Sequence, residues 1–334
     1  MNSSKRLDSQ NEALSKNLIT FTLGFIINCV NVAFVYIYFK NQVFHRNPRY
    51  VLYIHLVIND MIMLTVSVAL QIFTYTVPLR FAPCCIMLLI LVTTNKNSPL
   101  NLAGMAVERY IAVCRPLHHV QMCTVQRAYA LIALIWGVSL IPGLTDIIIA
   151  LATRSVSMDS RPVVCYPSFV YNTPHHRAQR EVAQVSEIGN VIYITGFSLR
   201  QILMFSFVFL TLIITYLKVL RIARTVSGSY QASARNAHNT ILLHGVQLFI
   251  CMLSFLSPFI NIALVTMWPN QRTTILFVIF LFTNVLPRLL SPLIYGVRDK
   301  TFNSHIRRHF CCQCCNTGEN KVVEPRRRSK QVLR

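Results

Sequence analysis

Residues 101–117 read NLAGMAVERYIAVCRPL, so an apolar stretch runs directly into Glu108 and Arg109 and stops at Pro116. Proline has no amide hydrogen and disfavours helical backbone in the residue before it, which predicts a helix end at this point. The residues upstream are also mostly apolar, and a helix needs about 20 such residues to cross about 30 Å of hydrocarbon. We therefore predict a membrane-spanning helix over 82–113 that presents its charged end at a membrane surface.

Six similar apolar stretches occur along the 334-residue chain. The chain is 54% apolar and 13% charged, whereas a soluble domain has about 25% charged residues, so the composition excludes a soluble protein and a disordered one. In lipid every backbone group must be hydrogen-bonded within its own segment, which favours helices. The predicted fold class is an all-α membrane protein, a seven-transmembrane helix bundle. The predicted spans are 18–39, 50–77, 82–113, 128–151, 189–217, 239–267 and 274–297.

Basic residues indicate how the bundle is oriented. The formal net charge is +21, and loops one, three and five together with the tail hold 19 Lys and Arg, against nine in the N-terminus and the other loops. Cytoplasmic loops carry such an excess. We predict a multi-pass plasma-membrane protein with an extracellular N-terminus, whose charge serves topology and not nucleic-acid binding. Its predicted parts are the N-terminus over 1–17, the bundle over 18–297, an amphipathic helix over 298–310 and a Cys/Arg-rich cytoplasmic tail over 311–334.

The segment after the last span is predicted to lie on membrane lipid at the inner leaflet. Phe302, Ile306 and Phe310 recur at helical spacing among basic residues, which is typical of a short amphipathic helix. Four cysteines follow within five residues and lack the loops of a zinc site, so we favour acylation over metal binding. These cysteines are Cys311, Cys312, Cys314 and Cys315, and the only glycosylation sequon of the chain is at Asn2.

Two ionisable residues of opposite charge lie deep in the predicted membrane. Asp60 is in the middle of span two and Arg288 is in the middle of span seven. A charge at this depth costs about 2.5–3.5 kcal/mol on insertion scales, so each residue needs a partner or a function. We predict that the two side chains face each other across the bundle, either as a static ion pair or as part of a switch.

The cysteines near the outer surface predict a disulfide. Cys84 precedes Arg109 by 25 residues, a helical rise of about 37 Å, so it reaches the extracellular surface when Arg109 reaches the cytoplasm. Cys165 lies in the long outer loop, in an oxidising compartment. A Cys84–Cys165 disulfide would hold this loop across the bundle mouth. Two free thiols are the alternative, and Cys85 is an adjacent competitor.

The stretch 101–117 resembles the third-helix signature of rhodopsin-like G-protein-coupled receptors, and most closely its odorant-receptor form. Further marker residues of that family occur in the other spans, at Asn31, Asp60, Trp136, Tyr216 and Ser291-Pro292-Leu293-Ile294-Tyr295. The phrases NPRY at 47–50, HLVIND at 55–60, NTILLHG at 239–245 and LPR at 286–288 resemble the fish odorant receptors of the 131-2-like group. The resemblance covers about residues 18–310.

The resemblance implies a receptor that converts odorant binding outside the cell into activation of a heterotrimeric G protein. The implied partner is the stimulatory olfactory G protein, which raises cyclic AMP, and the implied location is an olfactory sensory neuron. The coupling and switch residues carried over are Glu108, Arg109, Tyr110, Tyr216 and Tyr295. Glu108 is expected to restrain Arg109 in the resting state.

The chain departs from this family at positions that matter for signalling. Ser291 replaces the usual Asn before the proline of span seven, and Leu256 replaces a common tryptophan in span six. In many rhodopsin-like receptors the carboxylate that corresponds to Asp60 helps to bind a sodium ion with small polar groups on spans three and seven. Ser98 matches one of these groups, whereas Arg288 places a fixed cation at another.

The resemblance also implies a ligand pocket in the outer half of the bundle. Lys96 lies about 20 Å of helical rise from Arg109, and Arg200 lies at a similar depth in span five. These two cations predict an anionic odorant, unless Arg200 snorkels to the surface and Lys96 is hydrogen-bonded locally. The predicted lining residues are Leu91, Val92, Asn95, Lys96, Arg200, Phe259, Ala263, Leu281 and Val285.

Other functions remain as alternatives. A non-olfactory receptor of the same class fits the same motifs, and a proton-coupled transporter or channel would use Asp60, Lys96 and Arg288 as a relay. The chain shows no internal repeat, which argues against a transporter. It also shows no set of catalytic or metal-spaced residues at a common depth, so we predict no enzyme, cofactor or metal.

Overall fold

The described part of the protein is built from helices. A computed structural model describes residues 10–76, 80–153, 199–225, 257, 260–261, 263–298 and 300–306, and every regular element within these ranges is a helix. The all-α class predicted from the sequence is therefore confirmed. The long helices are α1 (Gln10–Lys40), α3 (Pro48–Thr76), α4 (Phe81–Cys114), α6 (Val125–Thr153) and α10 (Leu199–Thr225). The short helices α2 (Gln42–His45) and α5 (Pro116–Met122) connect them.

The observed helices follow the predicted spans with shifted ends. Helix α1 begins at Gln10, so it includes part of the segment that we predicted as a polar N-terminus. Span five is described from Leu199 onward, and span six is described only at 257, 260–261 and 263–267. Polar residues do not end a helix that can continue beyond the hydrocarbon, which explains the longer α1.

Four described segments are long and apolar enough to cross a membrane, and α10 contributes a shorter apolar stretch. The four segments are Asn11–Lys40, Pro48–Phe73, Val125–Ile149 and Pro269–Leu290, and the shorter stretch is Ser206–Val219. Helix α4 is long, but one of its faces is polar. The buried polar residues of this face are Thr93, Thr94, Asn97, Ser98 and Asn101. A helix that is surrounded by other helices can carry such a face, because neighbouring helices, and not lipid, provide partners for its hydrogen-bonding groups.

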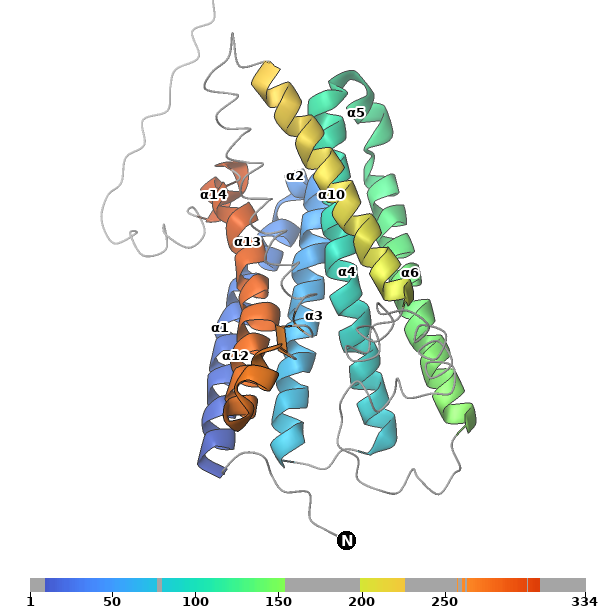
Figure 1. Ribbon diagram of the computed structural model, residues 1–334. Helices are drawn as coiled ribbons and strands as arrows, with labels where there is room; N and C mark the ends of the chain where they lie inside the picture. The colour runs from blue at the N-terminus through green and yellow to red at the C-terminus, as the bar shows by residue number, and fades with distance from the viewer. Residues whose placement is uncertain are drawn as a thin grey trace, which may run out of the picture. The chain divides into compact units, whose positions relative to one another are not determined.

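Helix α4 holds this central position in the described bundle. It packs against α3, α6 and α10, and α3 in turn packs against α1 and α6 (Figure 1). Gly104 allows a close approach of α6 to α4, because a Cβ atom at this position would lie 2.8 Å from Leu131 Cδ2. The polar face of α4 is thus buried against its neighbours, and α3 supplies most of its partners.

The seventh span contains a local change of helix type. It consists of α12 (Arg272–Phe280), the π-helical turn η4 (Leu281–Val285) and α13 (Leu286–Arg298), after the short 3-10 turn η3 (Pro269–Gln271). Pro287 follows η4 and has no amide hydrogen to donate to the preceding turn. Single π-turns of this kind often occur at functional sites. The turn directly precedes Arg288 and therefore helps to set the face of the helix on which Arg288 lies.

Residues 296–334 form a compact unit of their own. Within this unit, helix α14 (Lys300–Ile306) covers the middle of the amphipathic helix predicted over 298–310. The tail cysteines Cys311, Cys312, Cys314 and Cys315 lie outside the described residues.

Candidate functional site

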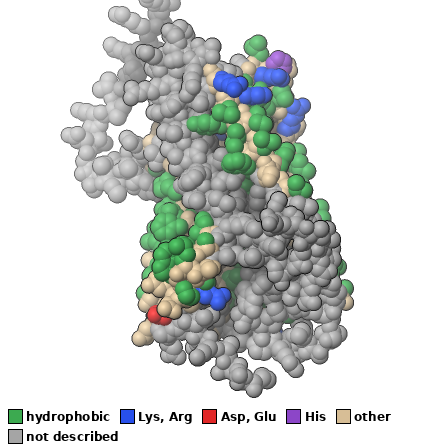
Figure 2. Space-filling view, in the orientation of Figure 1, with side chains coloured by type: hydrophobic (Ala, Val, Ile, Leu, Met, Phe, Trp, Pro, Cys, Tyr) green, Lys and Arg blue, Asp and Glu red, His purple; other side chains and the backbone are tan. Residues whose placement is uncertain are grey.

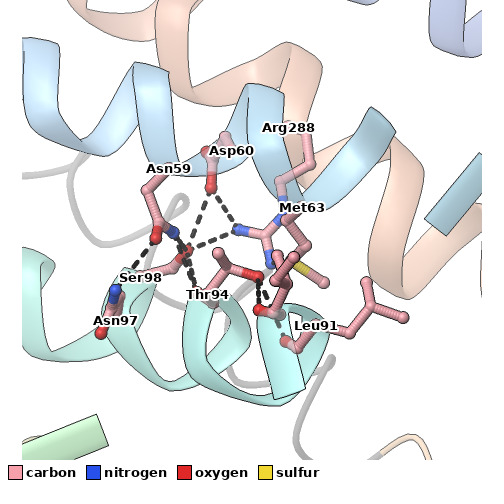
Figure 3. Close-up of polar contacts among 9 residues, drawn as sticks. Asn59, Asp60, Met63, Leu91, Thr94, Asn97, Ser98 and Arg288 are labelled. Atoms are coloured by element: carbon pink, nitrogen blue, oxygen red, sulfur yellow. Dashed lines mark hydrogen bonds and ion pairs between the residues drawn. The ribbon is translucent and has the colours of Figure 1, made fainter. Parts of the chain in front are cut away.

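A buried ion pair joins the second and seventh spans. Nη1 of Arg288 lies 2.7 Å from Oδ1 of Asp60, and the two side chains are 3% and 0% exposed. Asp60 comes from the middle of α3 and Arg288 from the start of α13, just after the π-turn. Figure 3 shows the two side chains pointing toward each other between their helices. The structure thus brings together the two charges that the sequence places at similar depth.

The hydroxyl of Ser98 on α4 is the third member of this cluster. Its Oγ donates a hydrogen bond to Asp60 Oδ1 at 3.0 Å. The same oxygen accepts from Nη1 of Arg288 and from Nδ2 of Asn59, each at 3.0 Å (Figure 3). A hydroxyl has one hydrogen to donate and two lone pairs to accept. Ser98 therefore uses its complete hydrogen-bonding capacity to connect α3, α4 and α13.

Amide side chains extend this network between α3 and α4. Asn59 Nδ2 donates to the carbonyl oxygen of Thr94 at 2.8 Å, and Asn97 Nδ2 donates to Asn59 Oδ1 at 3.2 Å. Further along, Asn101 Nδ2 donates to the carbonyl oxygen of Leu52 at 2.9 Å. Hydrogen bonds between membrane helices contribute about 0.6 kcal/mol each on average. The polar face of α4 thus fixes the register of α4 against α3.

Met63 is a neighbour of Arg288 that the sequence does not indicate. Nη2 of Arg288 lies 2.8 Å from Sδ of Met63, which is itself buried on α3. A thioether is a weak acceptor. The guanidinium is therefore held between a carboxylate and a hydroxyl on one side and a sulfur on the other. No pattern in an apolar helix distinguishes this methionine from ordinary core methionines.

The marker Trp136 on α6 binds α3 through a histidine. Nε1 of Trp136 donates to Nε2 of His55 at 2.9 Å. An indole N–H can only donate, so Nε2 of His55 must be the unprotonated nitrogen of a neutral ring. This contact attaches α6 to the same face of α3 that carries the polar network.

At the other end of α4, Glu108 contacts two basic residues. Its Oε1 lies 3.1 Å from Nε2 of His119 on α5, and its Oε2 lies 3.9 Å from Nε of Arg109. The Glu108 side chain is 9% exposed. Because the two contacts use different oxygens, His119 can hold the carboxylate in place while the other oxygen faces Arg109. Sequence reasoning missed His119, although it follows Glu108 by only 11 residues.

Helix α5 is fixed in place and exposes apolar side chains. Nη1 of Arg127 donates to the carbonyl oxygens of Gln121 and Met122, each at 3.1 Å, and so caps the C-terminal end of α5. On the helix itself, Leu117 is 88% exposed and Val120 is 79% exposed. Residues three apart share a helix face. This face is a second feature that the sequence analysis missed.

One further contact and one thiol with a raised pKa lie at this end of α4. Lys218 Nζ on α10 lies 5.3 Å from the centroid of the Tyr110 ring, a cation–π distance. Cys123 follows α5, and burial raises the pKa of its thiol, with the charge of Glu108 raising it further and Arg127 lowering it. Figure 2 shows Lys and Arg side chains gathered where α5 and the end of α10 lie, with hydrophobic side chains over the rest of α10. This end of the bundle is therefore basic and borders an apolar surface.

The predicted switch tyrosines are only partly described. Tyr216 is half-buried on α10. The side chain of Tyr295 lies outside the described residues, as does that of Ser291. Their part in switching stays a prediction.

At the opposite end of α4, Cys84 is fully buried and disulfide-bonded. It packs in an apolar cluster with Phe81, Cys85 and Leu88. Cys85 keeps its thiol. Cys165 lies outside the described residues, so its pairing with Cys84 stays a prediction.

The predicted pocket residues are distributed over α4 and the seventh span. Leu91, Val92, Asn95 and Lys96 are half-buried on α4. Val285 is buried against Ile27 and Leu64, and Leu281 packs on the same cluster. Ala263 is exposed, and the side chains of Phe259 and Arg200 lie outside the described residues, as does Asn2. Whether these residues line one ligand pocket stays a prediction.

Comparisons with known proteins agree with the resemblance seen in the motifs. The model of the 7 transmembrane receptor (rhodopsin) family matches residues 30–295. Odorant receptor 131-2 of Danio rerio is 26% identical over 310 residues, which cover 92% of this chain and 90% of that receptor. Olfactory receptor 51E1 of Homo sapiens is 26% identical over 286 residues, which cover 84% and 83%. The histamine H2 receptor of Homo sapiens is 22% identical over 234 residues, which cover 67% and 59%.

Proposed function

Because the chain belongs to the rhodopsin family of seven-transmembrane receptors, we propose that it is an odorant receptor that reports an extracellular small molecule to a heterotrimeric G protein. The family makes it a multi-pass receptor of the plasma membrane, with a ligand and a G protein as partners, and not an enzyme. The similarity to odorant receptor 131-2 over 92% of the chain is the observation that carries the olfactory part of the proposal.

The mechanism is a shift between two arrangements of the bundle. A ligand that binds one arrangement more tightly increases the population of that arrangement, and no covalent chemistry is needed. In the resting arrangement Glu108 holds Arg109, and His119 positions Glu108. In the active arrangement Arg109 is released and contacts the G protein, with Tyr110, Tyr216 and Tyr295 supporting it.

The surface around Arg109 supports contact with a G protein. It combines the basic end of α10 with exposed apolar residues of α5. Exposed apolar patches that are rimmed by polar residues mark interaction sites. This end faces the cytoplasm in the orientation predicted from the basic residues, with the N-terminus outside.

Three modifications belong to the same proposal. A Cys84–Cys165 disulfide would hold the outer loop, acylation of Cys311, Cys312, Cys314 and Cys315 would attach the tail to membrane lipid, and Asn2 would carry a glycan. The disulfide state of Cys84 supports the first. The clustering of the tail cysteines after α14 supports the second.

A cyclic AMP assay in transfected cells tests the proposal. Cells that express the receptor and the stimulatory olfactory G protein are exposed to waterborne acids, amines and steroids, with Arg109→Ala as the signalling-dead control at equal surface expression. We expect a saturable response to at least one class that Arg109→Ala abolishes. A response that persists in Arg109→Ala contradicts the coupling. A cyclic AMP response that is the same with and without this G protein also contradicts it.

The same assay tests the proposed anionic odorant. Lys96 is half-buried on α4, in the half of the helix away from Arg109, and Arg200 is the second proposed contact. We expect Lys96→Gln and Arg200→Gln to raise the concentration of an acidic agonist that gives a half-maximal response by roughly ten-fold or more, as losing a charge-assisted hydrogen bond implies. Arg80→Gln removes an exposed cation and serves as the matched control. An unchanged acid response in both variants shows that the ligand is bound without these charges.

A further inference from the structure

The buried polar cluster raises the question of whether a free cation can bind at Asp60. Many rhodopsin-like receptors hold sodium at the corresponding carboxylate. Hard cations are bound by several oxygen atoms with lone pairs to share. A sodium ion at Asp60 would therefore need several surrounding oxygens with unused lone pairs.

The oxygens that contact the guanidinium do not meet this requirement. Ser98 Oγ accepts from Arg288 and from Asn59 and donates to Asp60, so both of its lone pairs are in use. Asp60 Oδ1 already accepts from Arg288 Nη1 and from Ser98 Oγ. The amide of Asn59 turns a nitrogen, and not its oxygen, toward this hydroxyl.

The guanidinium itself takes the space and the charge that a metal ion would have. Nη1 lies 2.7 Å from Asp60 Oδ1, and Nη2 lies against the sulfur of Met63, which is a poor ligand for a hard cation. The pair has no net charge, and arginine stays charged in proteins. A second cation at this site would meet the first one in a buried setting where repulsion is weakly screened.

We propose that Arg288 is a tethered cation that replaces the sodium ion at Asp60, so that the receptor neither binds sodium in its core nor responds to it. A diffusible ion stabilises the state that binds it by an amount that rises with the logarithm of its concentration above its dissociation constant. A covalently attached guanidinium is present at fixed stoichiometry. The connection between α3, α4 and α13 therefore has the same strength at any external salt composition.

Thermal unfolding of the purified full-length receptor tests this proposal without an agonist. NaCl is titrated against N-methyl-D-glucamine chloride at constant ionic strength, and the melting temperature is recorded. We expect no sodium-specific change in the wild-type receptor. A saturable, sodium-specific rise in the wild type that Asp60→Asn abolishes overturns the proposal.

Two variants show whether the guanidinium is the reason. Arg288→Gln leaves the Asp60 carboxylate without its partner, and we expect sodium to raise the melting temperature of this variant saturably. Asp60→Asn disturbs the same pair but removes the anion, so it should stay indifferent to sodium. A folded, purified Arg288→Gln receptor whose melting temperature does not change with sodium contradicts the proposal. If this variant does not fold, the sodium titration of the wild-type receptor alone tests the proposal.

Because the melting temperature is measured without agonist or G protein, this test stays valid if the ligand or the G protein differs from those proposed above. Once an agonist is found, its half-maximal concentration in the wild type should be the same in sodium and in N-methyl-D-glucamine. In Arg288→Gln this concentration should shift with sodium.

Discussion

At the scale of single residues, we expect the two contacts of Glu108 to affect basal signalling to different extents. Glu108→Gln removes the charge that faces both His119 and Arg109. A loss of about 1 kcal/mol from the resting state changes a two-state ratio about five-fold. We expect Glu108→Gln to raise basal cyclic AMP by about this factor at equal surface expression. His119→Phe leaves the Arg109 contact in place, so it should raise basal signalling less.

His118 provides the matched control for this comparison, because it is the exposed neighbour of His119 on α5. His118→Phe should leave basal cyclic AMP at the wild-type level. If His119→Phe behaves like His118→Phe, then His119 does not position the carboxylate. If Glu108→Gln also leaves the basal level unchanged, the carboxylate does not restrain Arg109.

The residue scale also shows what a sequence can predict about this site. Asp60 and Arg288 are predictable because a charge at membrane depth stands out from its apolar surroundings and needs an opposite charge at the same depth. Met63 and His119 are not predictable in this way. A methionine in an apolar helix and a histidine in a short connecting helix are both ordinary, and only side-chain geometry shows what they contact.

At the scale of elements, α5 presents an apolar face whose contact with the G protein can be tested. Leu117 and Val120 lie on one side of it and are almost fully exposed. We expect Leu117→Asp to lower G-protein activation several-fold, because a charge on an apolar contact surface must be desolvated on binding. Agonist affinity measured without G protein should not change. The cyclic AMP maximum and direct ligand binding are the two measurements.

Met122→Asp serves as the control for this element, because Met122 is also exposed but ends the helix beside the Arg127 cap. If Leu117→Asp and Met122→Asp lower activation equally, the effect comes from loss of α5 and not from its face. If both variants activate the G protein as well as the wild-type receptor does, then α5 does not contact the G protein.

Hydropathy predicts the elements better than it predicts their irregularities. The long described helices follow the apolar stretches because burial in lipid requires an apolar perimeter and complete backbone hydrogen bonding. The π-turn at Leu281–Val285 has no such signal. Pro287 indicates a disturbance in the seventh span, but the type of disturbance depends on packing against the neighbouring helices.

At the scale of the whole molecule, the Asp60–Arg288 pair decides whether the core is a static clamp or part of the switch. Removing one partner of a buried pair costs about 3–5 kcal/mol because the other charge is left unpaired, whereas replacing both leaves no unpaired charge. We expect Asp60→Asn and Arg288→Gln to lower the melting temperature strongly, and the double variant to recover most of the loss. Thermal unfolding of the four purified receptors measures this coupling.

Basal cyclic AMP in the same four receptors then separates the two roles. A static clamp holds α3, α4 and α13 equally in the resting and active arrangements, so the variants would lose stability without a change in basal signalling per receptor. A pair that closes only in the resting arrangement shifts the population when it is broken, so each single variant would raise basal signalling. Since Ser98 joins this pair to the helix that carries Arg109 at its far end, we expect the second outcome. Basal cyclic AMP that stays at the wild-type level in both single variants, with the stability loss intact, assigns the pair to architecture alone.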